Sequence, residues 1–532
     1  MATQVLQLPP PYKGQQDVIP LSAAEWPYAQ FVQNFNLDTG IAKLRKPDTA
    51  FATSATTEQA IKLSTYGYGS TEQMYCTAFR STGPNTYWYN VSAGTFPAAV
   101  HTVAGADPGQ ILTLTFNNYL MFFGSSGSLL PAAVGPQYWN GAAWGTLGYT
   151  WPAGFTVPIG AEVYKNRAYF INRGTQTYGY SPVDSIAGAV TSVNLSYVAP
   201  TTSMLLNIVS VALSEGIQQQ NVLAFIFADG TILCYAGSWP NSTDWELIAP
   251  FKIPPVLESF NAICRVEGDV WVLTRSSIVS LRSLFTQGQS VALREPITAA
   301  ISNRWTEIVK KVETAYTYAI QDIEAIWDTE RDRVTITFPQ YSEVGALGGA
   351  LRNTTHRLCY SLTTRAWWEQ VGALNDSFPK RQTNPCYYKQ NLYYLDYTST
   401  VPRVFLAENE NASVWRDSWR GGTDQPYRGL LRTVPIPSRR NALMKYQGIE
   451  TIGLCAEGAD AQVKTYMELS TTAAGTQPLS TTQTGYQKPF INIGGTAGYM
   501  QYQFDVTTDS ATNAQGVELH GVNAWLEEGG YR

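Results

Sequence analysis

Carboxylates are the residues of this sequence that could do chemistry, because a closely spaced pair can act as acid and base or as a nucleophile in glycoside hydrolysis. Asp322 and Glu324 alternate with apolar residues on a predicted strand, so both carboxylates are expected on one solvated face. Asp328, Glu330 and Asp332 bracket a predicted tight turn, where Asp is favoured for its bonds to the backbone. We therefore predict no catalytic residue, and a propeller glycosidase is the alternative.

Other motifs for catalysis or cofactor binding are absent from the sequence, which has no phosphate loop, dinucleotide fingerprint, nucleophile elbow or metalloprotease motif. The six cysteines are scattered without CxxC spacing and there are only three histidines, so no metal and no cofactor is predicted. Most cysteines lie in apolar strands, which favours buried reduced thiols and folding in the cytoplasm. We expect neither a signal peptide nor a membrane span.

Composition favours strands and broad neutral surfaces. The chain of 532 residues has 32 Tyr, 20 Phe and 15 Trp with 43 Gly and 29 Pro, a mixture suited to strands and tight turns. Only 14% of its residues are charged, which is typical of a protein that assembles through wide contacts. Its net charge of −5 argues against a surface that grips nucleic acid. A chain of this length is expected to form two or three domains.

Short cassettes, each a polar turn followed by apolar and aromatic residues, recur along the chain. They begin at Asn118, Asn166, Asn221, Gly268, Arg331 and Asn391, with a weaker copy at Asn85. Their starts lie about 33 to 63 residues apart, mostly near 50, close to the length of one four-stranded propeller blade. Each cassette is typical of the turn and second strand of a hairpin, which must stack on its neighbours to bury its apolar face. We predict an all-β protein with a β-propeller of six or seven blades; unrelated hairpins in sandwich domains are the alternative.

The propeller is predicted over residues 51–425, between two further parts. Residues 1–50 are predicted to be an extended N-terminal arm, which has too little apolar content to fold by itself and must lie against something. Within the propeller, apolar residues at helical spacing predict a helix over 301–316 with Ser302 as its N-cap. Residues 426–532 alternate with period two between Ser/Thr/Gly-rich loops, which predicts an antiparallel β-sandwich.

The arm also carries a resemblance to a known family. Residues 32–47, VQNFNLDTGIAKLRKP, lead to Ala50-Phe-Ala-Thr53 and resemble the opening of tail hub (nozzle) proteins of short-tailed bacteriophages. Those chains often begin with the pattern N-f-x-x-x-G-x-x-x-x-R-x-G-f-x-x-f-A-T. This sequence departs from the pattern at Asp48, which stands where the glycine would be.

The resemblance continues into the repeats and the C-terminal part. Residues 318–339, followed by Tyr360 and Trp367, are similar to a blade pattern of the same family, although Arg333 replaces its small polar turn residue. Hub proteins also end in a compact β domain. The resemblance thus covers the arm, the repeats and the sandwich, through motifs that are individually weak and gain specificity from their order.

The resemblance implies a structural protein of the virion tail, made in the host cytoplasm. Such a protein forms a ring, typically a hexamer, below the portal and the tail adaptor (the head-to-tail connector), near tail fibres or spikes, and double-stranded DNA passes through it without tight binding. The aromatic residues of the arm and the densest basic clusters are then predicted to contact other subunits or the adaptor. These interface residues are Trp26, Tyr28, Phe31, Lys43, Arg45, Lys46, Arg439 and Arg440.

Recognition of host-surface glycans is the competing function. Exposed aromatic rings can stack on sugars, and the candidates for this are Trp139, Trp144, Trp367 and Trp368. Packing between blades explains the same tryptophans without a ligand. Glycan binding, or glycan hydrolysis by Asp322 and Glu324, therefore stays open as the alternative to a tail nozzle.

Overall fold

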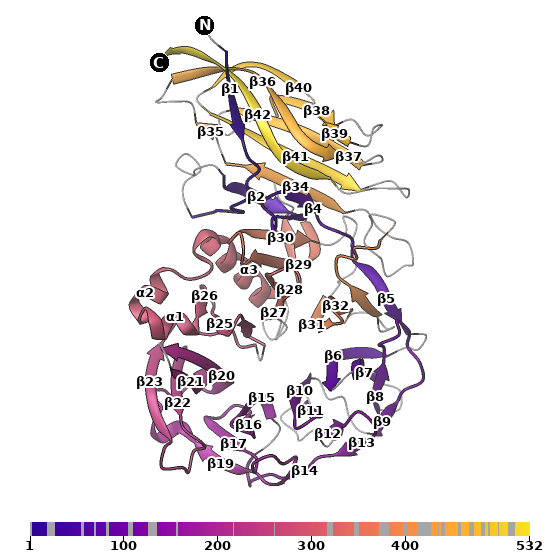
Figure 1. The fold of residues 1–532 in the computed structure, drawn as a ribbon, viewed down its shortest axis with the longest axis vertical. Coiled ribbons are helices and arrows are strands. Elements are labelled where there is room, and N and C mark those ends of the chain that lie inside the picture. Colours follow the sequence, from indigo (N-terminus) through magenta and orange to yellow (C-terminus); the bar gives the residue numbers. More distant parts are fainter. Residues whose placement is uncertain are drawn as a thin grey trace.

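The computed structural model confirms an all-β protein with a β-propeller (Figure 1). It describes residues 3–18, 27–54, 58–68, 71–80, 85–104, 110–125, 136–155, 158–215, 218–259, 261–315, 323–344, 351–371, 382–396, 403–412, 427–434, 436–437, 442–455, 459–467, 473–479, 485–487, 490–497, 499–508 and 517–531. Across these residues, no helix has both the length and the apolar character needed to cross a bilayer.

The described strands form seven blades around a ring, and Figure 1 shows this ring in the lower part of the molecule. Blade 1 has β6 (Gln59–Tyr68), β7 (Thr71–Arg80), β8 (Asn85–Asn90) and β9 (His101–Ala104). Blade 2 has β10 (Gln110–Phe116), β11 (Tyr119–Ser125), β12 (Gln137–Trp139) and β13 (Trp144–Thr146). Blade 3 has β15 (Pro158–Tyr164), β16 (Arg167–Asn172), β17 (Thr177–Tyr180) and β19 (Thr191–Asn194). Between blades 2 and 3, β14 (Gly148–Thr150) and β18 (Ala187–Ala189) form a parallel pair, and the short helix η1 (Leu195–Tyr197) follows β19.

The remaining blades complete the ring. Blade 4 has β20 (Leu205–Glu215), β21 (Gln218–Phe227), β22 (Thr231–Ala236) and β23 (Glu246–Lys252). Blade 5 has β24 (Ile263–Val266), β25 (Asp269–Leu273) and β26 (Ile278–Ser280), followed by α1 (Leu281–Thr286), α2 (Gln289–Arg294), η2 (Ala299–Ile301) and α3 (Ser302–Ala315). Blade 6 has β27 (Glu324–Asp328), β28 (Arg333–Val344), β29 (Leu351–Ser361) and β30 (Trp367–Val371). Blade 7 has β31 (Gln382–Tyr388), β32 (Asn391–Asp396) and β33 (Arg403–Leu406), and its outer strand is β5 (Thr49–Thr53) from the start of the chain.

The cassettes mark these blades because their turns require left-handed backbone. Asn117 and Asn118 both have positive φ, as do Lys165 and Asn166, so each pair makes the two-residue turn that matches the twist of a hairpin. The cassette at Asn221 is an exception, since this residue lies inside β21 and not at a turn. The weak copy at Asn85 begins the third strand of its blade, not the second.

Tyrosines tie neighbouring blades together. Three inner strands carry a tyrosine whose hydroxyl donates to a backbone carbonyl in the second strand of the next blade or in the turn just before it, over 2.9 to 3.4 Å. The pairs are Tyr66 to Asn118, Tyr164 to Asn221 and Tyr388 to Glu72. The phenol ring packs between blades while its hydroxyl keeps a partner, which explains part of the high tyrosine content.

The sandwich lies on the outer side of blade 6. One sheet contains β3 (Phe35–Asn36), β4 (Ala42–Leu44), β42 (Glu518–Tyr531), β36 (Ala442–Cys455) and β39 (Gly485–Gln487), with β1 (Thr3–Leu8) on β42 and β40 (Phe490–Ala497) on β36. The other contains β2 (Ala29–Gln33), β34 (Arg428–Thr433), β41 (Tyr499–Thr508), β37 (Ala459–Met467) and β38 (Gly475–Leu479), with β35 (Ile436–Pro437) on β41. Strand β2 also pairs in parallel with β30, so this second sheet continues into blade 6.

The N-terminal residues are therefore not a separate arm. Strands β1 to β4 belong to the sandwich, β5 belongs to blade 7, and Val32 and Phe35 are fully buried in the core that the sandwich shares with blade 6. As predicted, this segment does lie against something, and what it packs on is the rest of its own chain. Strands β1, β2 and β5 pair with segments hundreds of residues away in sequence, so the local pattern could not reveal their partners.

Candidate functional site

The carboxylate on β27 is buried and paired, not solvated. Glu324 is 5% exposed, accepts a hydrogen bond from the Asn261 amide, and its Oε1 lies 3.6 Å from Lys62 Nζ. The predicted solvated face for Asp322 and Glu324 is thus wrong for Glu324, because its inner strand faces neighbouring blades and not water. Asp322 lies outside the described residues.

A second inner-strand carboxylate, which the sequence reasoning missed, is Glu162 on β15. Its Oε1 accepts hydrogen bonds from the Ser210 hydroxyl at 2.5 Å and from the Arg265 guanidinium. Arg265 also donates to the Ser210 carbonyl at 3.0 Å, so the group joins blades 3, 4 and 5. Glu162 and Glu324 each have a cation as partner, which suits them to holding blades together. The only sequence signal for Glu162 is that it is the first charge after a long uncharged stretch.

The acidic turn and the cysteines that the sequence singled out also have structural roles. Asp332 has positive φ and forms the turn before β28, as expected. Five cysteines are free and buried, and burial raises the pKa of the Cys234 and Cys264 thiols to about 12, which keeps them protonated. Within the described ranges, no group of three or more His, Cys, Asp or Glu side chains could hold a metal ion.

The tryptophans proposed as sugar platforms pack inside the protein. The Trp144 ring lies flat against His101, 4.7 Å away and tilted by only 2°, and Trp139 packs beside it between blades 1 and 2. Trp367 and Trp368 are both buried. The packing explanation therefore accounts for all four rings, with only Trp139 and Trp144 partly exposed.

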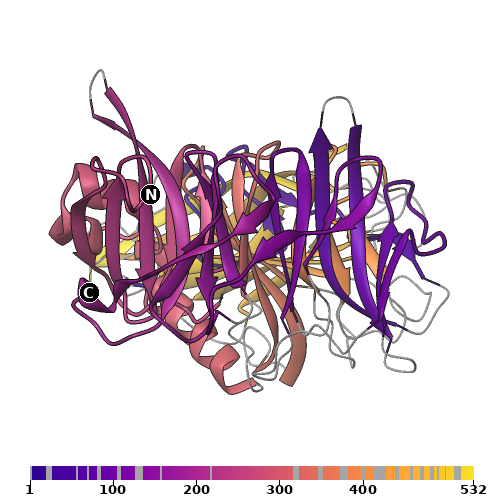
Figure 2. The same cartoon turned by 90° about the horizontal axis from the view of Figure 1, so that it is seen from below.

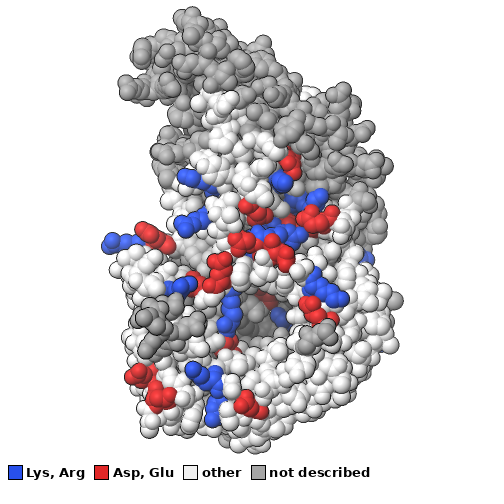
Figure 3. All heavy atoms as spheres, viewed as in Figure 1, with Lys and Arg blue, Asp and Glu red and all other residues white. Residues whose placement is uncertain are grey.

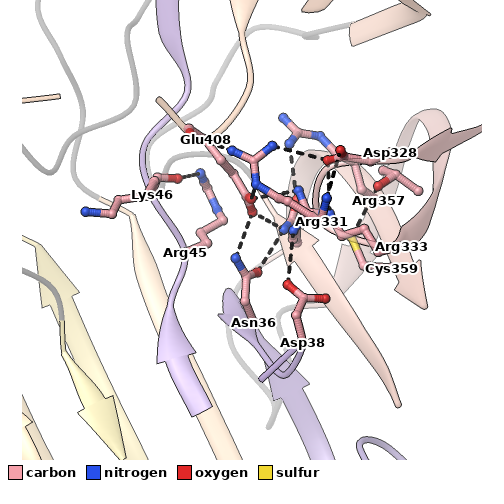
Figure 4. A network of polar contacts seen from close by, with 12 residues as sticks. Asn36, Asp38, Arg45, Lys46, Asp328, Arg331, Arg333, Arg357, Cys359 and Glu408 are labelled. Atoms are coloured by element: carbon pink, nitrogen blue, oxygen red, sulfur yellow. Dashed lines mark hydrogen bonds and ion pairs between the residues drawn. The ribbon is translucent and has the colours of Figure 1, made fainter. Parts of the chain in front are cut away.

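The largest concentration of charge lies where the N-terminal strands meet blades 6 and 7 (Figure 4). Four arginines and four carboxylates meet there, and we call them the junction network. The arginines are Arg45, Arg331, Arg333 and Arg357, and the carboxylates are Asp38, Asp48, Asp328 and Glu408. They come from the β3–β4 turn, the segment before β5, blade 6 and the end of blade 7.

Glu408 is the centre of one half of the junction network. Its Oε2 lies 2.6 Å from Arg333 Nη2 and 3.5 Å from Arg331 Nε, and Asp328 contacts the same two arginines at 3.6 and 3.2 Å. Burial alone would raise the pKa of Glu408, but the two arginines outweigh it and lower this pKa to about 2. Glu408 is therefore charged at neutral pH and offsets two cations, of which Arg333 is buried and Arg331 is 16% exposed.

Asp48 and Asp38 connect the N-terminal segment to this network. Asp48 pairs with Arg357 and lies 3.7 Å from Arg45, and these arginines outweigh burial and lower its pKa to about 2. Asp38 lies 3.8 Å from Arg333, yet burial dominates and raises its pKa to about 7. Asp38 is thus a carboxyl group that titrates near neutral pH in the same network as Asp48 and Glu408, which stay charged there.

The structure places only some of the predicted interface residues. Arg45 is buried in the junction network, so its predicted contact with another subunit is wrong. Lys43 pairs with Glu518 at 3.0 Å, and Lys46 lies 3.9 Å from Glu410. The remaining residues are Tyr28 and Phe31, which are half-buried on or beside β2, and Trp26, Arg439 and Arg440, which lie outside the described residues.

Comparisons with known proteins assign no activity to this chain. No family model and no curated protein matches the sequence. Similar solved structures include BBS1N in complex with ARL6DN (12% identity, 41% of this chain and 63% of that chain, TM-score 0.26) and YCF48 from Cyanidioschyzon merolae (10%, 67% and 98%, 0.36). An exo-β-1,3-galactanase from Phanerochaete chrysosporium is a third (10%, 81% and 97%, 0.25). The chain thus spans less than two thirds of the BBS1N chain, and all three likenesses are too distant to indicate a function.

Proposed function

We propose that this protein is a structural component of a phage tail, a nozzle or hub subunit that forms a ring below the portal and adaptor of a short-tailed virion. In this role it is a homo-oligomer, a hexamer by analogy with hub proteins. It contacts the adaptor and tail fibres or spikes. Double-stranded DNA passes through the ring during ejection without being held.

The observation that carries the proposal is the placement of the segment that resembles hub proteins. Residues 32–53 contribute to both sandwich sheets, to the junction network and to blade 7. A continuous sheet and a buried ion network join the propeller to the sandwich, unlike the small polar interfaces that let domains move. Such a stiff subunit suits a conduit that must keep its shape.

The state of the carboxylates also favours a structural role. Glu162 and Glu324, on inner strands where propeller glycosidases carry paired acids, are each bound by a cation. Neither the described carboxylates nor the four tryptophans form a site that favours glycan binding or hydrolysis. We therefore propose no enzymatic activity.

Electron microscopy of the purified protein tests the proposal. The expected result is a ring with a central hole, and tail-associated labelling when an antibody to the protein is applied to the virus particles. Specific binding on a glycan array by a chain that stays monomeric at every concentration would contradict it. Glycan recognition would then replace the tail nozzle as the proposed function.

A further inference from the structure

Neighbouring blades of the propeller share a seam, and each blade divides its side chains between two seams. Figures 1 and 2 show the blades standing side by side around the ring. Blade 7 is an example, because alternate residues of β32 point to opposite faces of the blade. Tyr393 and Leu395 belong to a large apolar cluster shared with blade 1, whereas Leu392 and Tyr394 face blade 6. Blade 7 therefore contacts its two neighbours through separate clusters.

The seam between blades 6 and 7 has the smallest apolar cluster among the described residues. Leu392, Tyr394 and Ala407 form this cluster, and Ile326 of blade 6 packs against it. The Tyr394 ring faces the Arg357 guanidinium at 4.4 Å, and its buried hydroxyl has no hydrogen-bond partner in the part of the chain that the structure describes. Burial of apolar surface therefore contributes less to this seam than to its neighbour between blades 7 and 1.

Oppositely charged side chains face each other across this seam, which we therefore call the charged seam. Asp48 comes just before β5 and Glu408 just after β33, and the Glu408 backbone N–H donates to Asp48 Oδ1 at 3.1 Å, so both carboxylates lie on the blade 7 side. Arg333 and Arg357 lie on β28 and β29 of blade 6. Asp48 pairs with Arg357, and Glu408 lies 2.6 Å from Arg333. Figure 3 shows basic and acidic side chains gathered where the propeller meets the sandwich.

Another ion pair crosses blade 7 at the inner strands. Lys62 Nζ on β6 lies 3.6 Å from Glu324 Oε1 on β27, and β31 of blade 7 packs against both of these strands. Lys62 belongs to blade 1, which packs on blade 7 through their shared apolar cluster and begins with the next strand after β5. Blades 7 and 1 thus form one apolar unit, and charged contacts on the inner strands and near the outer ones join this unit to blade 6.

Apolar and charged seams differ in what it costs to open them. Opening an apolar seam exposes nonpolar surface to water, and nothing offsets that cost. Opening the charged seam returns buried ions to water, and their hydration offsets much of the attraction that is lost. The ring is therefore expected to part at the charged seam at a lower free energy than at the seam between blades 7 and 1.

We propose that the charged seam is the clasp of the propeller, where the ring opens first and where ion pairs hold it closed. The structure describes the closed state, and opening is a rare local excursion from it. Because β2 fixes the sandwich to blade 6, opening moves blade 7 and not blade 6 relative to the sandwich. The clasp is a property of the single chain, whether or not that chain assembles into a tail.

Thiol labelling of the full-length chain tests where the ring opens. Ala407→Cys places a thiol in the charged seam, and Ala60→Cys makes the same change in the apolar seam between blades 7 and 1. Both positions are buried, as is Cys264 in the cluster of blades 4 to 6, so each thiol reacts with iodoacetamide only when its surroundings open. We expect peptide mass spectrometry to show Ala407→Cys labelled at least about tenfold faster than Ala60→Cys and Cys264. Equal rates, or faster labelling of Ala60→Cys, would overturn the clasp.

Removal of an ion pair tests whether charge holds the clasp closed. In the Ala407→Cys chain, Lys62→Met leaves Glu324 without that cation while the ring is closed, so we expect labelling at the charged seam to accelerate at least about tenfold and labelling of Cys264 to stay unchanged. Arg265→Met is the control, because it removes the comparable inner-strand pair between blades 3 and 5, and it is expected to leave labelling at the charged seam unchanged. No acceleration by Lys62→Met, or an equal one by Arg265→Met, would overturn the proposal.

Discussion

Glu408 is the residue on which the junction between propeller and N-terminal strands depends most directly, because it balances Arg331 and Arg333 in the interior. Glu408→Ala leaves the buried Arg333 guanidinium and the partly exposed Arg331 guanidinium without that partner. We expect the free energy of unfolding, measured by urea titration, to fall by about 3–5 kcal/mol. Glu410→Ala is the control, since Glu410 also contacts Arg331, at 3.6 Å, but is 63% exposed, and it is expected to change stability by less than about 1 kcal/mol. Equal effects of the two changes would contradict the role of the network.

Asp38 gives the junction a pH dependence of unusual sign. Burial raises the pKa of Asp38 from its ordinary 3.8 to about 7, so the folded state favours the neutral carboxyl group. This contribution is fully present below about pH 4 and is lost as pH rises through 7, at roughly 1.4 kcal/mol per pH unit. Asp38→Asn removes it. We expect the free energy of unfolding of Asp38→Asn, measured by urea titration, to rise relative to that of the unsubstituted chain between pH 5 and pH 8. A difference that stays constant over this range would show that Asp38 is charged throughout.

Asp48 and Glu408 act in the opposite direction. The pKa values of Asp48 and Glu408 are held at about 2, so their stabilisation is present above about pH 4 and is lost as pH falls towards 2. Asp48 and Arg333 are also the two departures from the hub-protein patterns, and both belong to this one network. In sequence they are unrelated substitutions. Only the folded chain shows that they add charges of opposite sign to the same buried site.

At the scale of elements, α3 begins with help from a distant segment. Ser302 is its first helical residue and not its N-cap, and the Asp17 carboxylate accepts the Arg304 backbone N–H. We expect Asp17→Ala to lower the melting temperature, at a cost of about 1 kcal/mol. Ser302→Ala is expected to cost less, and the reverse order would restore Ser302 as the cap.

The elements that the sequence predicted well are those with local signals. Hairpins at Asn118, Asn166 and Gly268 follow from turns that need left-handed backbone, and α3 follows from its helical spacing. The helices α1 and α2 have only six residues each, too few for a clear period, and were missed. Strands β2 and β5 were missed because their pairing partners lie far along the chain. The prediction that Glu324 is solvated was wrong for the same reason, because its burial depends on residues from other blades.

At the scale of the whole molecule, ion pairs join strands of blades that are not neighbours in the ring. Lys62 of blade 1 meets Glu324 of blade 6, and Arg265 reaches from blade 5 to Glu162 of blade 3. On the proposed function, we therefore expect a duplex about 20 Å wide to pass between copies of the chain and not through one propeller.

A lumen between copies must not hold the duplex, because one lysine or arginine contact with phosphate, repeated around a ring, would multiply into tight binding. The chain has 36 basic against 41 acidic residues, and several members of its described basic clusters are occupied: Lys43 pairs with Glu518, Arg45 is buried, and Lys311 pairs with Glu307 at 2.6 Å. We therefore expect the assembled ring to show no measurable affinity for double-stranded DNA at physiological salt in fluorescence anisotropy. Micromolar binding with a steep salt dependence would contradict this and would place a basic cluster in the lumen. Charge-reversal of Lys310, which is exposed on α3, would then test whether that helix lines the path.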